Sequence, residues 1–345
     1  MTALAPKDSL QTAAALAAEF RRDAAERDLA ATTPKPQRDA IRASGLLAMR
    51  IPTELGGLGA SWSLVLQVAR EIASADASLA HLFAYHHLDI VTPHLIGTVE
   101  QRTRWYSESA RDNAFWGNCL NPLDPRTSLA PADASTFRLN GIKSFCTGAS
   151  DSDLLLVSAA LPGVEQLQVM VLPTQREGVL IHDDWDNMGQ RQTDSGTVSF
   201  HDVLVHSDEL LGPPGAGGSV FASLRPCVTQ SILSNIFLGI AQGAFMEARD
   251  YVLPLDRPFP GGATRPSDDP YVLEHFGEMT VQLESAAPLL DAAAKALESA
   301  WQRGDDLTRQ HSRFDPHLGG AVDRGDPRAD IVCCDGVNDR QHALV

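Results

Sequence analysis

Lys143-Ser-Phe-Cys-Thr-Gly-Ala149 opens the stretch that decides the fold, and this stretch ends at Gly196. An apolar run at 154–157 follows it, and Arg191-Gln-Thr-Asp-Ser-Gly196 closes it. Short apolar segments between turn residues are typical of β-strands. The sequence before and after the stretch instead carries apolar residues at helical spacing. We therefore expect a β module between two helical blocks.

Six short segments predict the strands of this β module. Together they occupy about ninety residues with turn residues between them, which is the spacing of a small barrel or sandwich. Asn140-Gly141 is a typical hairpin signal, so we expect a turn between two strands there. A central β-barrel is the predicted form of the module. The expected strands are 114–119, 136–143, 154–159, 167–172, 178–182 and 196–205.

Helical periodicity dominates the rest of the chain up to about residue 303. The expected helices are 8–30, 37–44, 61–73, 78–95, 99–110, 221–252 and 272–303. From Asp305 onward the sequence is rich in Gly, Pro, Asp and Arg without a sustained period, so we expect mostly loop. The predicted fold class is α+β. Its expected parts are an N-terminal helical domain (1–113), a central β-barrel domain (114–211), an incomplete C-terminal helical bundle (212–307) and an irregular tail (308–345).

Composition excludes several classes of function. The chain has 345 residues, of which 43% are hydrophobic, so it can bury a sizeable core. Its formal net charge of −16 argues against nucleic acid or an anionic membrane surface as a partner. No apolar run reaches the roughly 18 residues of a membrane span, and the N-terminus lacks the basic flank of a signal peptide. The glycine-rich nucleotide-binding motifs and the serine-hydrolase motif are also missing.

The cysteines and histidines do not indicate a metal centre. The 5 cysteines show no CxxC pair or Cys/His metal spacing, and the 11 histidines include no HExxH motif. An odd number of cysteines does not suggest a disulfide framework. The expected location is therefore the reducing cytoplasm.

Four residues before the apolar run are candidates for chemistry. His81 and Tyr85 are four apart on an expected helix and share a face, although spacing alone favours a water or backbone partner for them. Asn118 follows a strand glycine and could present its amide to a planar ligand, unless Gly117 only marks a bulge. Thr147 could bond a heteroaromatic nitrogen or a peroxide, or could simply belong to a strand end with a turn.

Three further features follow the apolar run. Trp185 could flank an aromatic ligand or fill the mouth of the expected barrel. Thr193-Asp194-Ser195-Gly196 is a turn signature, and we expect it to be structural. The Arg257 guanidinium could clamp a phosphate, although a lone arginine in a loop is usually solvated.

Together these residues resemble the acyl-CoA dehydrogenase superfamily, in its flavin-dependent monooxygenase branch. The resemblance covers about residues 10–307 and depends on a set of short stretches in a fixed order. The matching stretches are Ile41-Arg-Ala-Ser-Gly-Leu-Leu47, Ala80-His-Leu-Phe-Ala-Tyr-His86, Trp116-Gly-Asn118, Phe145-Cys-Thr-Gly-Ala149, Asp183-Asp-Trp185, Arg191-Gln-Thr-Asp-Ser-Gly196, Leu238-Gly-Ile-Ala241 and Arg257-Pro258.

The resemblance implies a homotetrameric oxidoreductase that uses reduced FMN and O2 to oxygenate the sulfur of an aromatic compound of the dibenzothiophene type. FMN would come from a separate NADH-dependent flavin reductase, and FAD is the less favoured cofactor. Arg257 would hold the flavin phosphate across a subunit interface. His81 would lie near the activated oxygen, and Trp185 near the substrate. The residues implied to line the flavin are Tyr85, Asn118, Lys143, Ser144, Phe145, Cys146 and Thr147.

The chain departs from the family pattern after its last expected helix. The family continues through two more helices to a histidine motif at the flavin, whereas this chain has Arg309-Gln-His-Ser-Arg-Phe-Asp-Pro316 directly after residue 307. His311 is therefore a weak candidate. Without those helices, we expect exposed apolar faces on 221–252 and 272–303, including Ile232, Ile236, Leu289 and Leu290. The alternatives are a dehydrogenase of the same fold acting on an acyl thioester, or a truncated relative without activity.

Overall fold

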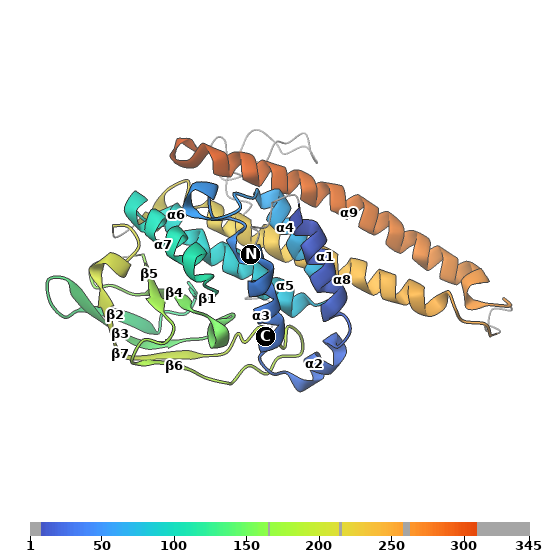
Figure 1. Ribbon diagram of the computed structural model, residues 1–345, viewed down its shortest axis with the longest axis horizontal. Coiled ribbons are helices and arrows are strands. Elements are labelled where there is room, and N and C mark those ends of the chain that lie inside the picture. Colours follow the sequence, from blue (N-terminus) through green and yellow to red (C-terminus); the bar gives the residue numbers. More distant parts are fainter. Residues whose placement is uncertain (1–7, 165, 214–215, 258–262, 309–345) are drawn as a thin grey trace, which may run out of the picture.

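The computed structural model describes residues 8–164, 166–213, 216–257 and 263–308. It shows helices at both ends of the described chain and two sheets between them, which confirms the predicted α+β class (Figure 1). Within these ranges, no helix has the length and apolar character needed to cross a membrane. The irregular tail expected after residue 308, with His311, lies outside the described residues.

The helices before the sheets follow the predicted positions with two interruptions. The expected helix 8–30 is broken after Phe20, where the Arg27 guanidinium donates to the Phe20 carbonyl (2.7 Å) and binds the Asp76 carboxylate (2.7 Å). The expected helix 78–95 is divided before Pro93, which has no backbone N–H and restricts the preceding residue. The helices are α1 (Ser9–Phe20), α2 (Ala24–Ala30), α3 (Lys35–Ser44), α4 (Trp62–Ala73), α5 (Ala77–Ile90), α6 (Thr92–Ile96) and α7 (Val99–Asp112).

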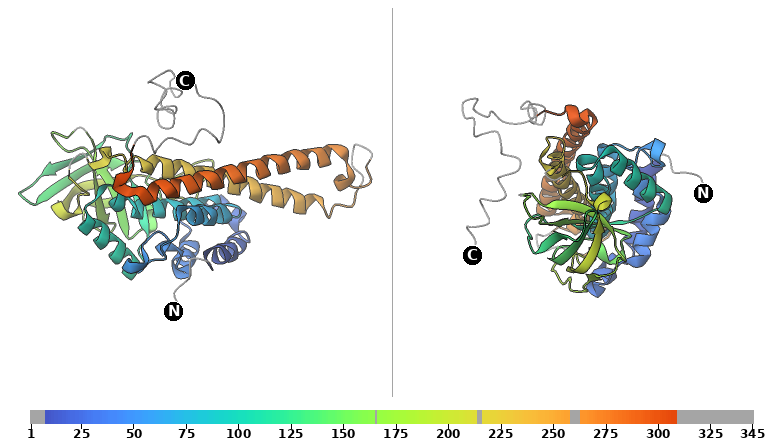
Figure 2. Two further views of the ribbon diagram at one scale, coloured as in Figure 1. Left: turned by 90° about the horizontal axis from the view of Figure 1, so that it is seen from above. Right: turned by 90° about the vertical axis from the view of Figure 1, so that its left-hand side faces the viewer.

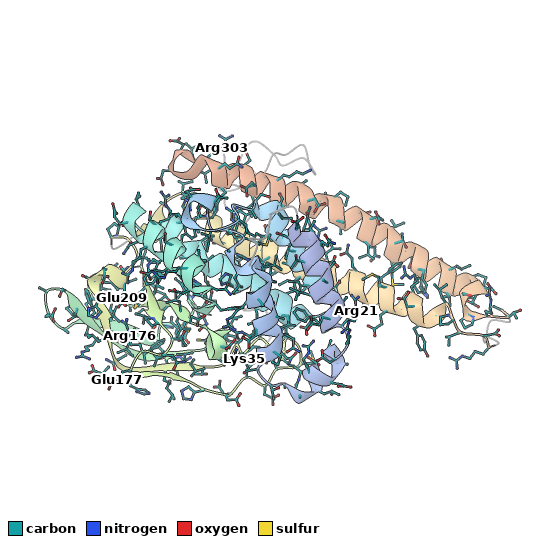
Figure 3. The ribbon with its side chains drawn as sticks, in the orientation of Figure 1. Arg21, Lys35, Arg176, Glu177, Glu209 and Arg303 are labelled. Atoms are coloured by element: carbon teal, nitrogen blue, oxygen red, sulfur yellow. The ribbon has the colours of Figure 1, made fainter. Side chains whose placement is uncertain are left out.

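The strands form two sheets in the described chain. One sheet has the order β1-β4-β5, with β1 parallel to β4, and the other has the order β2-β3-β7-β6 with antiparallel pairs throughout. At the β7 end, Arg176 and Glu209 form a two-pronged ion pair of 2.6 Å, and Figure 3 shows the two residues near each other. The strands are β1 (Trp116–Cys119), β2 (Thr127–Pro131), β3 (Thr136–Lys143), β4 (Leu154–Ala159), β5 (Gln168–Pro173), β6 (Val179–Ile181) and β7 (Val198–His206).

The expected closed β-barrel is wrong. The two sheets meet in a shared apolar layer, to which β4 contributes Leu155 and Val157 and β7 contributes Val198 and Phe200. Leu156 of β4 points the other way, into the helical core. The sheet β1-β4-β5 is therefore covered on both faces, which explains why β4 is a continuous apolar run rather than an alternating one.

The hairpin expected at Asn140-Gly141 is also wrong. These residues lie inside β3, where the pairing with β7 shifts between Leu139 and Gly141. Gly141 has φ +126°, and a side chain there would overlap the Arg126 carbonyl oxygen, so the glycine serves a bulge rather than a turn. Sequence reasoning also missed β2, a strand at the sheet edge that ends in a proline.

Two long helices, α8 (Leu224–Val252) and α9 (Pro270–Arg303), form the last part of the described chain. Figure 2 shows that the pair extends well beyond the rest of the molecule. The expected exposure of Ile232 and Ile236 is wrong, because both belong to the helical core. Leu289 is 58% exposed as expected, and Leu290 is half-buried. Other exposed apolar side chains on these two helices are Phe237, Ile240, Tyr251, Tyr271, Leu273 and Val281.

Four histidines in the helical half of the molecule have little contact with water: His86 and His87 are fully buried, and His81 and His94 are half-buried. Burial lowers the pKa of His81, His86 and His94 to about 4, and it lowers the pKa of His87 well below its usual value. The unfolded chain binds protons at these histidines below about pH 6.5, whereas the folded chain does not. Folding therefore becomes less favourable as the pH falls through this range.

We expect the free energy of unfolding to fall as the pH is lowered from about 6.5 to about 4. Each buried histidine contributes a slope of about 1.4 kcal/mol per pH unit between its two pKa values. Burial raises the pKa of Asp89 to about 7 and that of Asp194 to about 6, which acts in the opposite direction. Four histidines outweigh two aspartates. Urea unfolding across this range measures the slope, and a flat or rising stability toward pH 4 would contradict the expectation.

Candidate active site

Helix α5 supplies the first wall of the candidate site. Its N-terminus is capped by Asp76, whose carboxylate accepts from the Leu79 N–H at 3.0 Å. His81 and Tyr85 lie one turn apart with ring centroids 4.3 Å apart. Asp89 follows one turn later, so the three polar side chains occupy one helical face. Helix α5 lies against β1 and α8 (Figure 1), and Asp89 on this face binds Asn118 of β1 and Arg225 of α8.

Asn118 at the end of β1 is held in a single orientation. Its Nδ2 donates to the Asp89 carboxylate at 2.8 Å, and its Oδ1 accepts from the Leu120 N–H at 2.9 Å. Because the Leu120 N–H can only donate, the amide oxygen must face it, and this fixes the positions of the amide N and O. One hydrogen of the Asn118 amide remains for a ligand.

Asp89 connects this amide to α8. Its Oδ1 also accepts from the Arg225 guanidinium at 3.1 Å, and its side chain is fully buried. Burial raises the pKa of Asp89 to about 7, while Arg225 and Asn118 oppose the shift. Burial likewise raises the pKa of the Tyr85 hydroxyl, which therefore stays protonated near neutral pH.

The chain from β3 into residues 144–147 supplies the second wall. Phe145 has φ +60° and is 62% exposed, an arrangement that a bulky residue adopts only where the surroundings impose it. Its ring lies edge-on to Trp185, with centroids 5.9 Å apart. Thr147 is buried and lies beside β1. Its carbonyl oxygen accepts from the Asn118 N–H at 2.9 Å.

The loop before β7 closes this wall through hydroxyl groups. Thr147 Oγ1 lies 2.9 Å from Ser195 Oγ, and Ser195 Oγ lies 2.8 Å from Thr193 Oγ1. The carbonyl oxygen of Gln190 accepts from Thr193 Oγ1 at 2.9 Å and from the Trp185 indole N–H at 2.8 Å. The indole ring and the hydroxyl groups are thus anchored at one point of the loop.

These walls enclose one cleft with a volume of about 990 Å³. Seven of the residues proposed from the sequence line it together. The His81 ring lies within reach of the Gln190 side chain, and the pKa of His81 is lowered to about 4 mainly by burial. A neutral imidazole therefore faces the cleft. The seven residues are His81, Tyr85, Asn118, Ser144, Phe145, Thr147 and Trp185.

Comparison with known proteins identifies the family. Residues 8–113 match the acyl-CoA dehydrogenase N-terminal domain, and residues 120–203 match the acyl-CoA dehydrogenase middle domain. A probable FMNH2-dependent monooxygenase of Pseudomonas putida, SfnC, is 46% identical over 307 residues, which cover 88% of this chain and 78% of SfnC. The chain belongs to the acyl-CoA dehydrogenase family.

Solved structures of this family are also similar. Methanesulfinate monooxygenase MsuC from Pseudomonas fluorescens is 47% identical with a TM-score of 0.84, and the match covers 88% of this chain and 78% of MsuC. FMN-bound TdsC from Paenibacillus sp. A11-2 is 42% identical with a TM-score of 0.83, covering 88% and 79% of the two chains. TdsC is a dibenzothiophene monooxygenase. These members of the acyl-CoA dehydrogenase family are monooxygenases.

In this member of the acyl-CoA dehydrogenase family, three of the predicted flavin ligands lie outside the cleft. The Lys143 ammonium is buried and donates to the carbonyl oxygens of Asn121 (2.9 Å) and Asp124. The Cys146 thiol is buried and donates to the Lys143 carbonyl oxygen at 3.4 Å. Arg257 is exposed beyond the end of α8. Lys143 and Cys146 therefore stabilise the wall and do not line it.

The acyl-CoA dehydrogenase cleft also contains residues that sequence reasoning missed. Thr193 and Ser195 line it, although their segment was expected to be only a turn. Asp89 lies directly behind Asn118, and its spacing of four from Tyr85 was a usable signal. Nothing in the sequence indicated Arg225, because its contact with Asp89 depends on how α8 packs against α5.

Proposed function

We propose that the chain is an FMN-dependent monooxygenase that transfers an oxygen atom from O2 to the sulfur of an aromatic compound of the dibenzothiophene type. The observation that carries the proposal is the meeting of Tyr85, Asn118, Thr147 and Trp185 in one cleft. Its support from relatives is that SfnC is FMNH2-dependent and that TdsC has been solved with FMN bound.

The cleft fits a flavin in its chemistry. Tyr85, Phe145 and Trp185 offer aromatic surface for a planar ring system. Asn118 offers a fixed amide N–H, and His81 offers a neutral imidazole at the cleft wall. A concave, largely apolar site with a few placed polar groups is what a cofactor of this kind requires.

Reduced FMN, delivered by a separate NADH-dependent flavin reductase, supplies the activation of O2 when it is bound. The residues of the chain then have three tasks. Tyr85 and Phe145 would cover the flavin ring and limit the access of water to it. Asn118 would offer an amide N–H beside the ring, and His81 would offer an imidazole that is neutral at pH 7 because of its burial. Trp185 holds the substrate.

The lining of the cleft argues against the alternative of an acyl thioester dehydrogenase. Such an enzyme needs a free carboxylate as the base that removes a proton. Among the described residues that line the cleft, the only carboxylate is Asp124. Its oxygens bind the Arg126 guanidinium at 2.8 and 2.7 Å, and this pairing holds the pKa of Asp124 below its usual value. Asp124 is thus a fixed ion-pair partner and a poor base.

The proposal is tested by oxygenation. Purified protein, FMN, NADH and a flavin reductase should convert dibenzothiophene to its sulfoxide or sulfone, detected by mass spectrometry with ¹⁸O2. Methanesulfinate should be assayed in parallel, because MsuC, a methanesulfinate monooxygenase, is 47% identical to this chain over the aligned residues. Turnover of methanesulfinate alone would keep the monooxygenase and replace the substrate class. FMN binding without turnover of either compound would support an inactive relative.

Trp185→Ala removes the indole ring and should raise the KM for dibenzothiophene about 3- to 10-fold. This factor corresponds to the free energy of one aromatic–aromatic contact. FMN affinity should stay within about twofold of the original. Trp185→Phe should recover most of the loss, because it keeps an aromatic ring beside Phe145. Phe237→Ala is the matched control, since Phe237 is an exposed aromatic residue on α8 outside the cleft lining. Equal effects of Trp185→Ala on both KM and FMN affinity would contradict the assignment.

Arg257 remains the proposed phosphate ligand, contributed by a second copy in a homo-oligomer. Within one chain it follows α8, a helix of 29 residues that is about 43 Å long. Arg257→Gln should weaken FMN binding at least tenfold and leave riboflavin binding unchanged, because riboflavin lacks the phosphate. Arg126→Gln is the control, since Asp124 already neutralises Arg126 at the cleft. Parallel fluorescence titrations with FMN and riboflavin measure both, and a loss confined to Arg126→Gln would reverse the assignment.

A further inference from the structure

A chain of hydroxyl groups leads away from the cleft wall. It runs from Thr147 through Ser195 to Thr193 in steps of 2.9 and 2.8 Å, and it ends at the carbonyl oxygen of Gln190. The three side chains are 7%, 4% and 1% exposed, so water has little access to them. Each hydroxyl has one hydrogen to donate, and the carbonyl has none. The order of donors along the chain is therefore a physical property of the site.

The carbonyl end sets this order. The Thr193 hydroxyl donates to the Gln190 carbonyl, so its hydrogen is used and it can only accept from Ser195. The Ser195 hydrogen is then used as well, and Ser195 accepts from Thr147. In this arrangement every hydroxyl hydrogen has a partner. Thr147 lines the cleft, and in this arrangement its hydroxyl can only accept a hydrogen bond from a ligand, because its own hydrogen is used.

The opposite order has a cost. If Thr147 donates into the cleft, one hydrogen bond of the chain is lost. Either Ser195 keeps its bond to Thr193 and the Thr147–Ser195 bond is lost, or the hydrogens of Ser195 and Thr193 both reverse and the Thr193 bond to the Gln190 carbonyl is lost. A ligand atom that accepts from Thr147 thus gains one hydrogen bond while the protein loses another. A ligand atom that donates to Thr147 gains its bond without this loss. Thr147 therefore favours a ligand atom that donates a hydrogen bond over one that accepts it.

We propose, on the basis of the proposed flavin function, that Thr193 and Ser195 make the cleft select reduced over oxidised flavin by fixing Thr147 as an acceptor. The central ring of reduced flavin carries a hydrogen on its nitrogen N5, whereas oxidised flavin has a lone pair there. Ser195 and Thr193 are positioning residues in this device. It suits an enzyme that must take up its flavin already reduced and release it after oxidation.

Ser195→Ala tests the device by removing the acceptor of the Thr147 hydrogen. The ratio of the Kd for oxidised FMN to the Kd for reduced FMN should fall about 2- to 10-fold, the range of one hydrogen bond. A tenfold fall corresponds to a midpoint potential of bound FMN lower by about 30 mV for two electrons. Thr193→Val should lower the same ratio, because it frees the Ser195 hydrogen to point toward Thr147. Anaerobic titrations with oxidised and dithionite-reduced FMN give both Kd values.

Ser152→Ala is the matched control. Ser152 is also buried and bonded to a threonine hydroxyl, that of Thr174 at 2.8 Å, but it does not line the cleft. It should leave the Kd ratio unchanged. The proposal is overturned if Ser195→Ala and Thr193→Val weaken both flavin states equally, or if the ratio does not change. Failure of the unaltered protein to bind either form of FMN would instead remove the proposed function.

Discussion

Replacing Arg38 with alanine should lower the free energy of unfolding by about 3–5 kcal/mol, because it removes one partner of a buried ionic network. The Arg38 guanidinium is fully buried and donates to the carbonyl oxygens of Gly148 (3.0 Å) and Asp151 (2.8 Å). It also lies 3.6 Å from the Asp194 carboxylate and 4.4 Å from the centre of the Phe115 ring. Burial lowers the pKa of Arg38 to about 10, so it remains charged at neutral pH.

Urea denaturation followed by circular dichroism measures this effect. Arg104→Ala is the matched control, because Arg104 binds Glu108 and Asp208 at the surface, where an ion pair contributes about 1 kcal/mol or less. Equal losses in the two variants would show that burial of Arg38 adds nothing. We also expect weaker FMN binding in Arg38→Ala, because Arg38 joins the two loops that carry Thr147 and Ser195.

Replacing Asp89 with alanine should reduce the rate of oxygenation about a hundredfold, although Asp89 does not line the cleft. Asp89 orients the Asn118 amide, and its loss would leave that amide free to turn. Arg225 would also lose its buried partner, so stability should fall as well. Asp89→Asn keeps an oxygen that can accept from Asn118. It should recover most of the rate while leaving Arg225 without a counter-charge.

A double-mutant cycle separates positioning from general damage. If Asp89 acts through Asn118, the losses in kcat caused by Asp89→Ala and Asn118→Ala should not add, and the double variant should resemble Asn118→Ala alone. Melting temperatures of all variants show how much of each protein is folded. Fully multiplicative losses in kcat would indicate that Asp89 has a separate role.

The sequence predicted seven of the twenty residues that line the cleft, and it missed the lining segments 120–126 and 187–190. His81 and Tyr85 share a helical face, as a spacing of four requires. The errors at Lys143 and Cys146 have a local cause. The positive φ of Phe145 breaks the alternation of the strand, so Ser144, Phe145 and Thr147 face the cleft while Lys143 and Cys146 turn inward. Backbone strain of this kind has no signature in residue types.

The fold was predicted less well where one residue type serves two structures. Asn140-Gly141 is as compatible with a bulge as with a hairpin, because both need a residue that tolerates positive φ. The sequence also did not predict that the strands form two open sheets instead of one closed barrel. Strand segments can be recognised locally, but the parallel pairing of β1 with β4 is a contact between distant parts of the chain. The register of such a pair is set by packing on both faces.

The sheet β1-β4-β5 has one face on the helices and the other on the second sheet. A fragment consisting of residues 114–211 would therefore bare Trp116, Leu156 and Val171 to water. Such a fragment would be expected to aggregate when expressed alone, and grafting the cleft onto another scaffold would require α5 as well. The β module therefore depends on the helices for the burial of one of its faces.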